Sequence, residues 1–267
     1  MDVVKLASPF GDHMVLQHGV PAPLWGTGEP GMPATAELCG QTLTTRADER
    51  GAWRVTFAPL TPGGPFTLRV RGSSTVVVRD VLIGDVWLCS GQSNMEWPLL
   101  QSDGADDELR RADIPGLRLV TVPKIPADTP QRDAAMSWSV CSASSAKLFS
   151  AVAFHFGKRL HQELDIPIGL INCSWGGSCA EAWMPLDVLE RDPRHRQLLS
   201  FVSLCPCAPR PPARPYHVKK VTLRDGLWCG LWNSVTITLW LRHEAYYAER
   251  VSSFMCAQYS RSNIAGR

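Results

Sequence analysis

The chain has 267 residues, of which 45% are apolar and 19% charged, and its formal net charge is +2. A balance this close to neutral excludes a strong electrostatic attraction to nucleic acid or acidic membranes, and the apolar content excludes a disordered chain. No run approaches the ~18 consecutive apolar residues of a membrane-spanning helix, so we expect no membrane span in one or two folded domains.

Residues 1–80 are predicted to form an N-terminal antiparallel β-sandwich domain. Short apolar runs recur at Met14–Gln17, Thr35–Leu38, Trp53–Phe57 and Phe66–Val70. The last two alternate apolar and polar residues, as half-buried strands do, and close strand spacing with Gly and Pro turns is typical of a sandwich. Gly26–Gly31 matches G-x-G-x-x-G, but it contains a proline and opens no helix, so we predict a turn rather than a dinucleotide site.

From residue 81 the pattern changes to alternating strands and helices. Val81–Cys89 is a long apolar run that predicts a buried strand, and Ile168–Ile171 predicts another. Between them, apolar residues that recur every four positions predict one face of an amphipathic helix, namely Leu148, Val152, Phe156, Leu160 and Leu164. This order predicts an α/β fold with a parallel sheet and helices on both faces, with its site at the carboxyl ends of the strands.

The last part of the sequence is less regular. Five prolines between Pro206 and Pro215 indicate a loop or linker, and no clean periodicity follows Asn233. We therefore predict a hydrolase-like domain over residues 81–240 and an atypical tail over 241–267. The start of the sequence has no basic region followed by an apolar stretch, so we expect no signal peptide there, and the compartment is left open.

Nine cysteines are an odd and scattered set. Cys89, Cys173 and Cys179 lie in or beside apolar segments, where we expect small buried thiols. Cys205 and Cys207 form a single C-x-C without a matched second pair, so we expect no zinc site.

Ser93 is the candidate nucleophile. It lies in a turn, Gly91–Asn94, that ends the predicted strand and can lift its hydroxyl into a cleft. A serine hydroxyl needs a neighbouring base and donors for the developing oxyanion. Ser93 can supply one backbone N–H, and Gly176 or Gly177 a second, since glycine lets the backbone approach a substrate closely. The alternatives are a helix N-cap for Ser93 and an ordinary tight turn for the glycines.

Two segments around these residues resemble one known family. Asp80–Glu96 closely resembles the first signature block of the sialate O-acetylesterases, which belong to the SGNH hydrolase superfamily. Pro167–Ser178, followed by Glu181–Trp183, resembles a second block. Met14–Gln17 and Trp25–Gly31 look like the family's N-terminal β-domain, so that the resemblance covers about residues 5–200.

The resemblance implies hydrolysis of O-acetyl esters on sialic acid or related sugars, typically at the 9-O-acetyl group. Ser93 then matches the nucleophile, and Gly176 or Gly177 matches the glycine of the oxyanion hole. No metal or organic cofactor is implied, and the implied partner is the acetylated sugar. Members of the family are often secreted or lysosomal.

The sequence also departs from the family. Leu231–Ser234 resembles the start of a later block and then the match ends, and the family's late Asp-x-x-His block, which carries the base, is missing. No histidine has the family's context; the seven are His13, His18, His155, His161, His195, His217 and His243. On the predicted helix, His155 is expected near the apolar face and His161 toward water, and His195 is expected on a solvated, Arg-rich face.

We therefore expect an incomplete C-terminal part of the hydrolase domain, as a truncation or a frameshift near Asn233 produces. Two alternatives to a sialate O-acetylesterase stay open. One is an acetylxylan-type carbohydrate esterase, which shares the serine and glycine blocks. The other is a catalytically inactive fragment that only binds a sugar.

Overall fold

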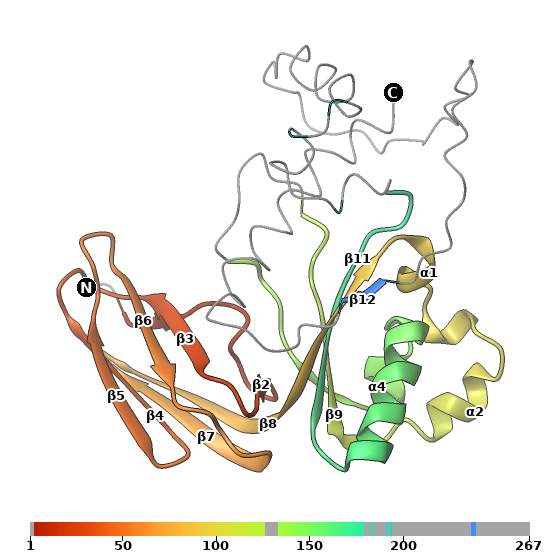
Figure 1. Cartoon of the computed structure of the whole chain (residues 1–267), viewed down its shortest axis with the longest axis horizontal. Coiled ribbons are helices and arrows are strands. Elements are labelled where there is room, and N and C mark those ends of the chain that lie inside the picture. The colour runs from red at the N-terminus through yellow and green to blue at the C-terminus, as the bar shows by residue number, and fades with distance from the viewer. Residues whose placement is uncertain are drawn as a thin grey trace.

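The computed structural model describes residues 3–125 and 133–178, with Trp183, Arg191, Pro193 and the strand Thr236–Thr238 in addition. Strands dominate the first ninety residues, and strands and helices alternate after them (Figure 1). The strands are β1 Lys5–Leu6, β2 Val15–Gln17, β3 Ala22–Thr27, β4 Pro33–Leu38, β5 Gln41–Arg46, β6 Ala52–Phe57, β7 Gly63–Arg71, β8 Thr75–Gly91, β9 Ile114–Thr121, β10 Ser139–Cys141, β11 Ile168–Ser174 and β12 Thr236–Thr238. The helices are α1 Ser93–Glu96, the 3-10 helix η1 Leu99–Gln101, α2 Ala105–Arg110, α3 Ala143–Ala146 and α4 Ala151–Leu164.

The N-terminal strands belong to two sheets that share one apolar core. β1, β3 and β6 form a three-stranded sheet, while β5, β4, β7 and β8 are consecutive neighbours in a nine-stranded sheet. β6 buries every second residue, Trp53, Val55 and Phe57, and these pack in one cluster with Leu68 and Val70 of β7. The four strands expected from the apolar runs are all present, and a strand follows Gly26–Gly31 as predicted.

β8 connects this region to the α/β region, because it is a single strand of 17 residues. Its first half pairs antiparallel with β7, its middle pairs with β2, and its last seven residues pair parallel with β11. The predicted boundary at residues 80 and 81 falls inside this strand. The division into 1–80, 81–240 and 241–267 stays a prediction.

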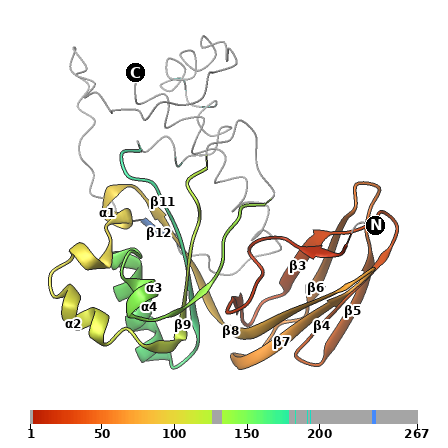
Figure 2. The same cartoon turned by 180° about the vertical axis from the view of Figure 1, so that it is seen from behind.

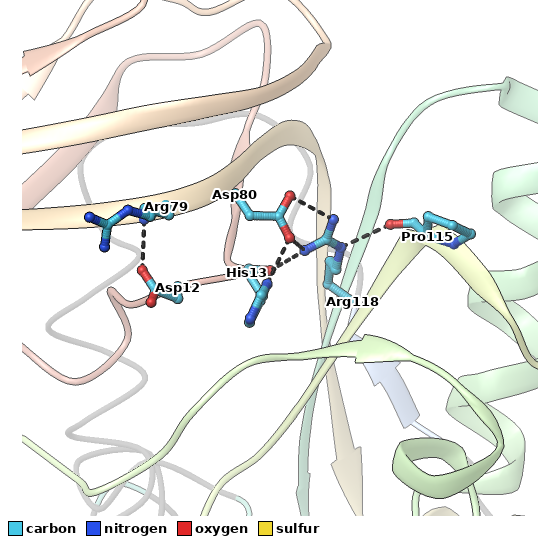
Figure 3. Close-up of polar contacts among 6 residues, drawn as sticks. All are labelled: Asp12, His13, Arg79, Asp80, Pro115 and Arg118. Carbon is cyan, nitrogen blue, oxygen red and sulfur yellow. Dashed lines mark hydrogen bonds and ion pairs between the residues drawn. The ribbon is translucent and has the colours of Figure 1, made fainter.

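An ion pair with a buried arginine, which we call the joint, fixes β8 where its pairing partners change (Figure 3). Asp80 has a left-handed backbone with φ of 55°. Its carboxylate accepts hydrogen bonds from Arg118 of β9 at 2.5 and 3.1 Å, and lies 2.7 Å from Nδ1 of His13. Arg118 is only 4% exposed, and its Nε donates to the Pro115 carbonyl at 2.9 Å. The hydrogen bond from Arg118 lowers the pKa of Asp80 below its ordinary value.

The α/β region follows the predicted strand–helix–strand order, with a mixed rather than a fully parallel sheet. β9, β11 and β8 are parallel neighbours, whereas β10 and β12 pair antiparallel. The described helices lie along one face of these strands, on the side away from the N-terminal region (Figures 1 and 2). Helices on both faces stay a prediction. No helix in the described ranges is both long and apolar enough to cross a lipid bilayer.

The predicted apolar face of α4 is confirmed in its middle, where Val152, Phe156 and Leu160 pack against the core, but not at its two ends. Leu148 lies before the helix and is 75% exposed, and Leu164 is 48% exposed. The deepest contacts come instead from Ala153, Phe154 and Gly157. A Cβ on Gly157 would lie 2.6 Å from a methyl carbon of Leu170, so small residues let α4 approach β11. Hydrophobic periodicity misses this contact because it counts only large side chains.

Candidate active site

The ends of two neighbouring parallel strands bring Ser93 and Gly176 together. β8 and β11 stay in register up to the pair of Gly91 and Ser174, and the Trp175 N–H donates to the Gly91 carbonyl at 2.9 Å. The segments that follow β8 and β11 therefore leave the sheet at the same place. A Cβ built on Gly176 would lie 3.7 Å from the Cα of Ser93.

Helix α1 holds Ser93 at the surface through its buried neighbour. Gly91 has φ of 148°, a backbone that favours glycine, and it turns the chain out of β8. Met95 is 1% exposed and accepts a hydrogen bond from Ser150 Oγ at 3.4 Å, so α1 is anchored in the core. Ser93 is exposed two residues earlier, and it is the first residue of α1 rather than its N-cap, Gln92.

A cavity of about 480 Å³ opens in front of Ser93. This size is typical of a small-molecule pocket. Its lining residues come from α1 and the segment after it, from the end of β9 and the segment after it, from the segment between α3 and α4, and from the end of β11 and the turn after it. They are Ser93, Glu96, Trp97, Pro98, Thr121, Lys124, Leu148, Asn172, Ser174 and Gly176. The charged residues among them are Glu96 and Lys124.

The two candidate glycines differ in their surroundings. Gly176 lines the cavity, and its N–H donates to Oε2 of Glu96. Gly177 is outside the lining set, has φ of 79°, and a Cβ there would meet nothing within 4 Å. The geometry therefore favours Gly176 as the second donor near Ser93, and gives Gly177 the role of shaping the turn.

Glu96 and Lys124 form an ion pair across the cavity. Glu96 lies one helical turn after Ser93, so both side chains point to the same side of α1. Lys124 follows β9, in a segment held to β11 by the hydrogen bond from Val122 N–H to the Asn172 carbonyl at 2.9 Å. Sequence reasoning assigned neither residue a role, although the three-residue spacing from Ser93 was a usable signal for Glu96.

Asn172 and Ser174 add two buried polar side chains to the cavity wall. They are 5% and 8% exposed, and Ser174 Oγ donates to Oδ1 of Asn172 at 2.7 Å. Because side chains alternate along a strand, residues two apart at the end of β11 share one face. Neither residue was predicted as part of the site, although their alternation at a strand end indicates a polar edge.

Histidines in the described ranges lie away from the cavity lining. His13 and His18 face Asp80 and Asp85. The expectation for α4 is reversed: His155 is exposed, while Nδ1 of His161 lies 2.7 Å from the Ile166 carbonyl. His161 packs where Gly116 leaves room, since a Cβ there would lie 2.4 Å from its ring. His195, His217 and His243 are outside the described residues.

The buried thiols cannot replace Ser93 as a nucleophile. Cys89 and Cys173 are 0% and 4% exposed, as predicted, and burial raises the pKa of each thiol to about 12. Such thiols stay protonated at neutral pH. Cys179 and the pair Cys205 and Cys207 are outside the described residues. Within the described ranges, no three His, Cys, Asp or Glu side chains gather so as to hold a metal ion.

Comparison with known proteins gives named relatives for this arrangement, although no protein-family model matches the sequence. Sialate O-acetylesterase of Homo sapiens is 36% identical over 200 residues, which cover 67% of this chain and 38% of that protein. The Mus musculus protein of the same name is 36% identical, with 67% and 37% covered. The crystal structure of a carbohydrate acetylesterase from Xanthomonas citri aligns with a TM-score of 0.69 and 38% identity, over 71% of this chain and 44% of that one. The chain thus spans less than half the length of these relatives.

Proposed function

Because this chain belongs to the sialate O-acetylesterase family over the matched residues, we propose that it hydrolyses O-acetyl esters of sialic acid or related sugars with Ser93 as nucleophile. The observation that supports this most is the placement of Ser93 beside Gly176 at one end of the sheet, in one cavity. A serine next to a backbone N–H that can face the developing oxyanion is the minimum arrangement for acyl transfer.

In the proposed reaction, Ser93 Oγ forms a bond to the acetyl carbonyl carbon and gives its proton to a base. The π electrons of the carbonyl move onto its oxygen, and the N–H groups of Ser93 and Gly176 stabilise that oxyanion. Collapse of the tetrahedral intermediate breaks the bond to the sugar oxygen, which takes up the proton. Water then attacks the acetyl–Ser93 ester by the same steps, releasing acetate and restoring Ser93.

The base is the open element of this proposal. No histidine of the described ranges lines the cavity with Ser93. The spacing Asp-x-x-His does occur once in the sequence, at Asp192 and His195, which both lie outside those ranges. The matched relatives also extend well beyond the match, so a base can come from outside the matched residues.

For the fold, we propose that the N-terminal strands form a β-sandwich domain and that the α/β region is an SGNH-type hydrolase sheet. Two observations support this. Strands of both N-terminal sheets bury their alternate residues in one core. In the α/β region, the order β9-β11-β8 places both candidate site segments at the carboxyl ends of adjacent parallel strands, where open α/β sheets bind ligands.

The nucleophile is tested with a fluorophosphonate probe, which forms a covalent bond with an activated serine. We expect labelling of the full chain and loss of that label in Ser93→Ala, while Ser144→Ala, an exposed serine on α3, keeps it. Hydrolysis of p-nitrophenyl acetate should follow the same pattern. Equal label and equal hydrolysis in the wild type and Ser93→Ala would contradict the proposal.

The substrate is tested separately. Release of acetate from O-acetylated sialic acid but not from acetylated xylan supports the sialate reading, and the reverse favours the acetylxylan-type esterase. The absence of a base among the described residues favours a second candidate, a fragment that only binds sugar. That candidate predicts saturable binding of acetylated sialic acid without acetate release. His195→Ala in the labelling assay shows whether His195 activates Ser93.

A further inference from the structure

We propose that the Glu96 carboxylate is a resident anion of the active site, which occupies the oxyanion donor of Gly176 with Lys124 as its counter-ion and must be displaced by an entering substrate. The consequence for catalysis rests on the function proposed for Ser93 and Gly176. The existence of a small carboxylate site at Glu96, Lys124 and Gly176 does not depend on that function.

The contacts come from three separate parts of the chain. Oε2 of Glu96 accepts the N–H of Gly176, and Oε1 of the same carboxylate pairs with Nζ of Lys124. Glu96 ends α1, Lys124 follows β9 and Gly176 follows β11. One carboxylate thus spans two donors, and all three residues line the same cavity as Ser93.

The space around Gly176 supports the placement of this carboxylate next to Ser93. A Cβ on Gly176 would lie 2.7 Å from Oε2 of Glu96 and 3.7 Å from the Cα of Ser93. The Gly176 N–H can stabilise an oxyanion on an acetyl–Ser93 adduct only when Glu96 has left it. The arrangement therefore represents a closed state of the donor.

The ion pair between Glu96 and Lys124 is exposed enough to separate at low cost. The side chains of Glu96 and Lys124 are 35% and 39% exposed, and ion pairs near solvent contribute little to folding. A charged acceptor forms a stronger hydrogen bond with an N–H than a neutral carbonyl does. The neutral ester carbonyl is therefore the weaker competitor for Gly176, whereas the tetrahedral oxyanion and product acetate carry the charge that the two donors favour.

Acetate is the direct probe, because it is the carboxylate end of a glutamate side chain without the tether. We expect Glu96→Ala to bind acetate roughly tenfold tighter than the wild type or more, since the tethered carboxylate competes at an effective concentration on the order of millimolar. The measurement is an acetate titration of the full 15N-labelled chain, followed at the Gly176 amide. Adding Lys124→Met to Glu96→Ala should remove the gain.

Glu108→Ala is the matched control, because Glu108 pairs with Lys158 at the contact between α2 and α4, outside the cavity lining. It should bind acetate as the wild type does. Equal acetate affinity in the wild type and Glu96→Ala, or a Gly176 amide that does not respond, would overturn the inference. Glu96→Gln, which keeps a side-chain oxygen but loses the charge, should show an intermediate gain and guards against misfolding of the alanine variant.

Ser93 labelling separates this inference from the proposed function. If Glu96 blocks the donor, Glu96→Gln should be labelled by the fluorophosphonate several-fold faster than the wild type. Acetate binding gained in Glu96→Ala without Ser93-dependent labelling in any variant supports the resident anion and refutes the serine esterase. Ser93-dependent labelling with no gain in acetate binding supports the esterase and refutes the resident anion.

Discussion

The joint and the candidate active-site cavity each contain an ion pair, but the cations of the two pairs differ in burial. In the joint, Arg118 is 4% exposed and is held by Asp80, which β8 presents from a left-handed backbone. In the cavity, Glu96 and Lys124 are both more than a third exposed. A buried charge is strongly destabilising when it loses its partner, whereas a hydrated one is not. The first pair therefore serves the fold, and the second is available for binding.

This difference is clearest in the elements that carry the pairs. Asp80 and Arg118 lie within β8 and β9, so their backbones are fixed by neighbouring strands. Lys124 follows the end of β9, and Glu96 ends a helix of four residues. Loops and helix ends at the carboxyl edge of a sheet change conformation at lower cost than the strands do. Substitutions should separate the two pairs.

The largest expected effect is that of Arg118→Met. It leaves the Asp80 carboxylate without its main partner in a mostly buried place, and we expect the free energy of unfolding to fall by about 2–4 kcal/mol. Asp80 is 29% exposed in its side chain and can rehydrate in part, which keeps the loss below that of a fully buried pair. Urea unfolding followed by fluorescence measures it. A change below ~0.5 kcal/mol would remove the distinction between the pairs.

Gly176→Ala should have the next largest effect, on reactivity rather than on folding. Its methyl group would enter the space next to Ser93 and Glu96, and we expect labelling of Ser93 to slow about tenfold, as small displacements at a reacting centre do. Gly177→Ala is the matched control. Its φ of 79° makes alanine unfavourable by ~1 kcal/mol of unfolding free energy, but the open space there leaves labelling unchanged. Slower labelling in Gly177→Ala, with unchanged labelling in Gly176→Ala, would make Gly177 the donor.

The strands that position the candidate site could be predicted from the sequence, whereas no role in the site was predicted for Glu96 or Lys124. Val81–Cys89 and Ile168–Ile171 are each predicted as a buried strand of a parallel sheet, and they lie in β8 and β11, which the structure pairs side by side and in register. Ser93 and Gly176 follow from that placement. Lys124 could not be predicted, because its contact with Glu96 depends on the path of the chain after β9, which no local pattern encodes.

The joint was beyond sequence reasoning for a related reason. A histidine in a turn and an aspartate inside a long apolar run have no visible relation at a separation of 67 residues. The buried arginine alternates with Leu117 and Leu119, which face the helices, so a pattern of burial on both faces was needed to see it. The α4 face was predicted in part: Val152, Phe156 and Leu160 pack against the core, whereas the close approach through Gly157 has no signal in the spacing of large apolar residues.

Acid titration should reveal the joint, with a smaller effect. The Arg118 hydrogen bond lowers the pKa of Asp80 in the folded state, so this carboxylate contributes stability above its unfolded pKa of about 3.9. That contribution is lost as the pH falls from this value through the lower folded pKa. In Asp80→Asn, the free energy of unfolding should depend less on pH between pH 5 and the acid limit, by urea unfolding at several pH values. An identical pH dependence in both proteins would show that Asp80 is not coupled to folding.

Lys124→Met should have the smallest effect on stability. It removes one partner of an exposed pair, and we expect the free energy of unfolding to change by less than ~0.5 kcal/mol. Urea unfolding in parallel with Arg118→Met places both variants on one scale. The same substitution frees Glu96 from its counter-ion, so the Gly176 amide should shift in the 15N spectrum even though folding does not change. A large loss of stability without a shift at Gly176 would make Lys124 a structural residue like Arg118, and the cavity pair would then differ from the joint only in its exposure.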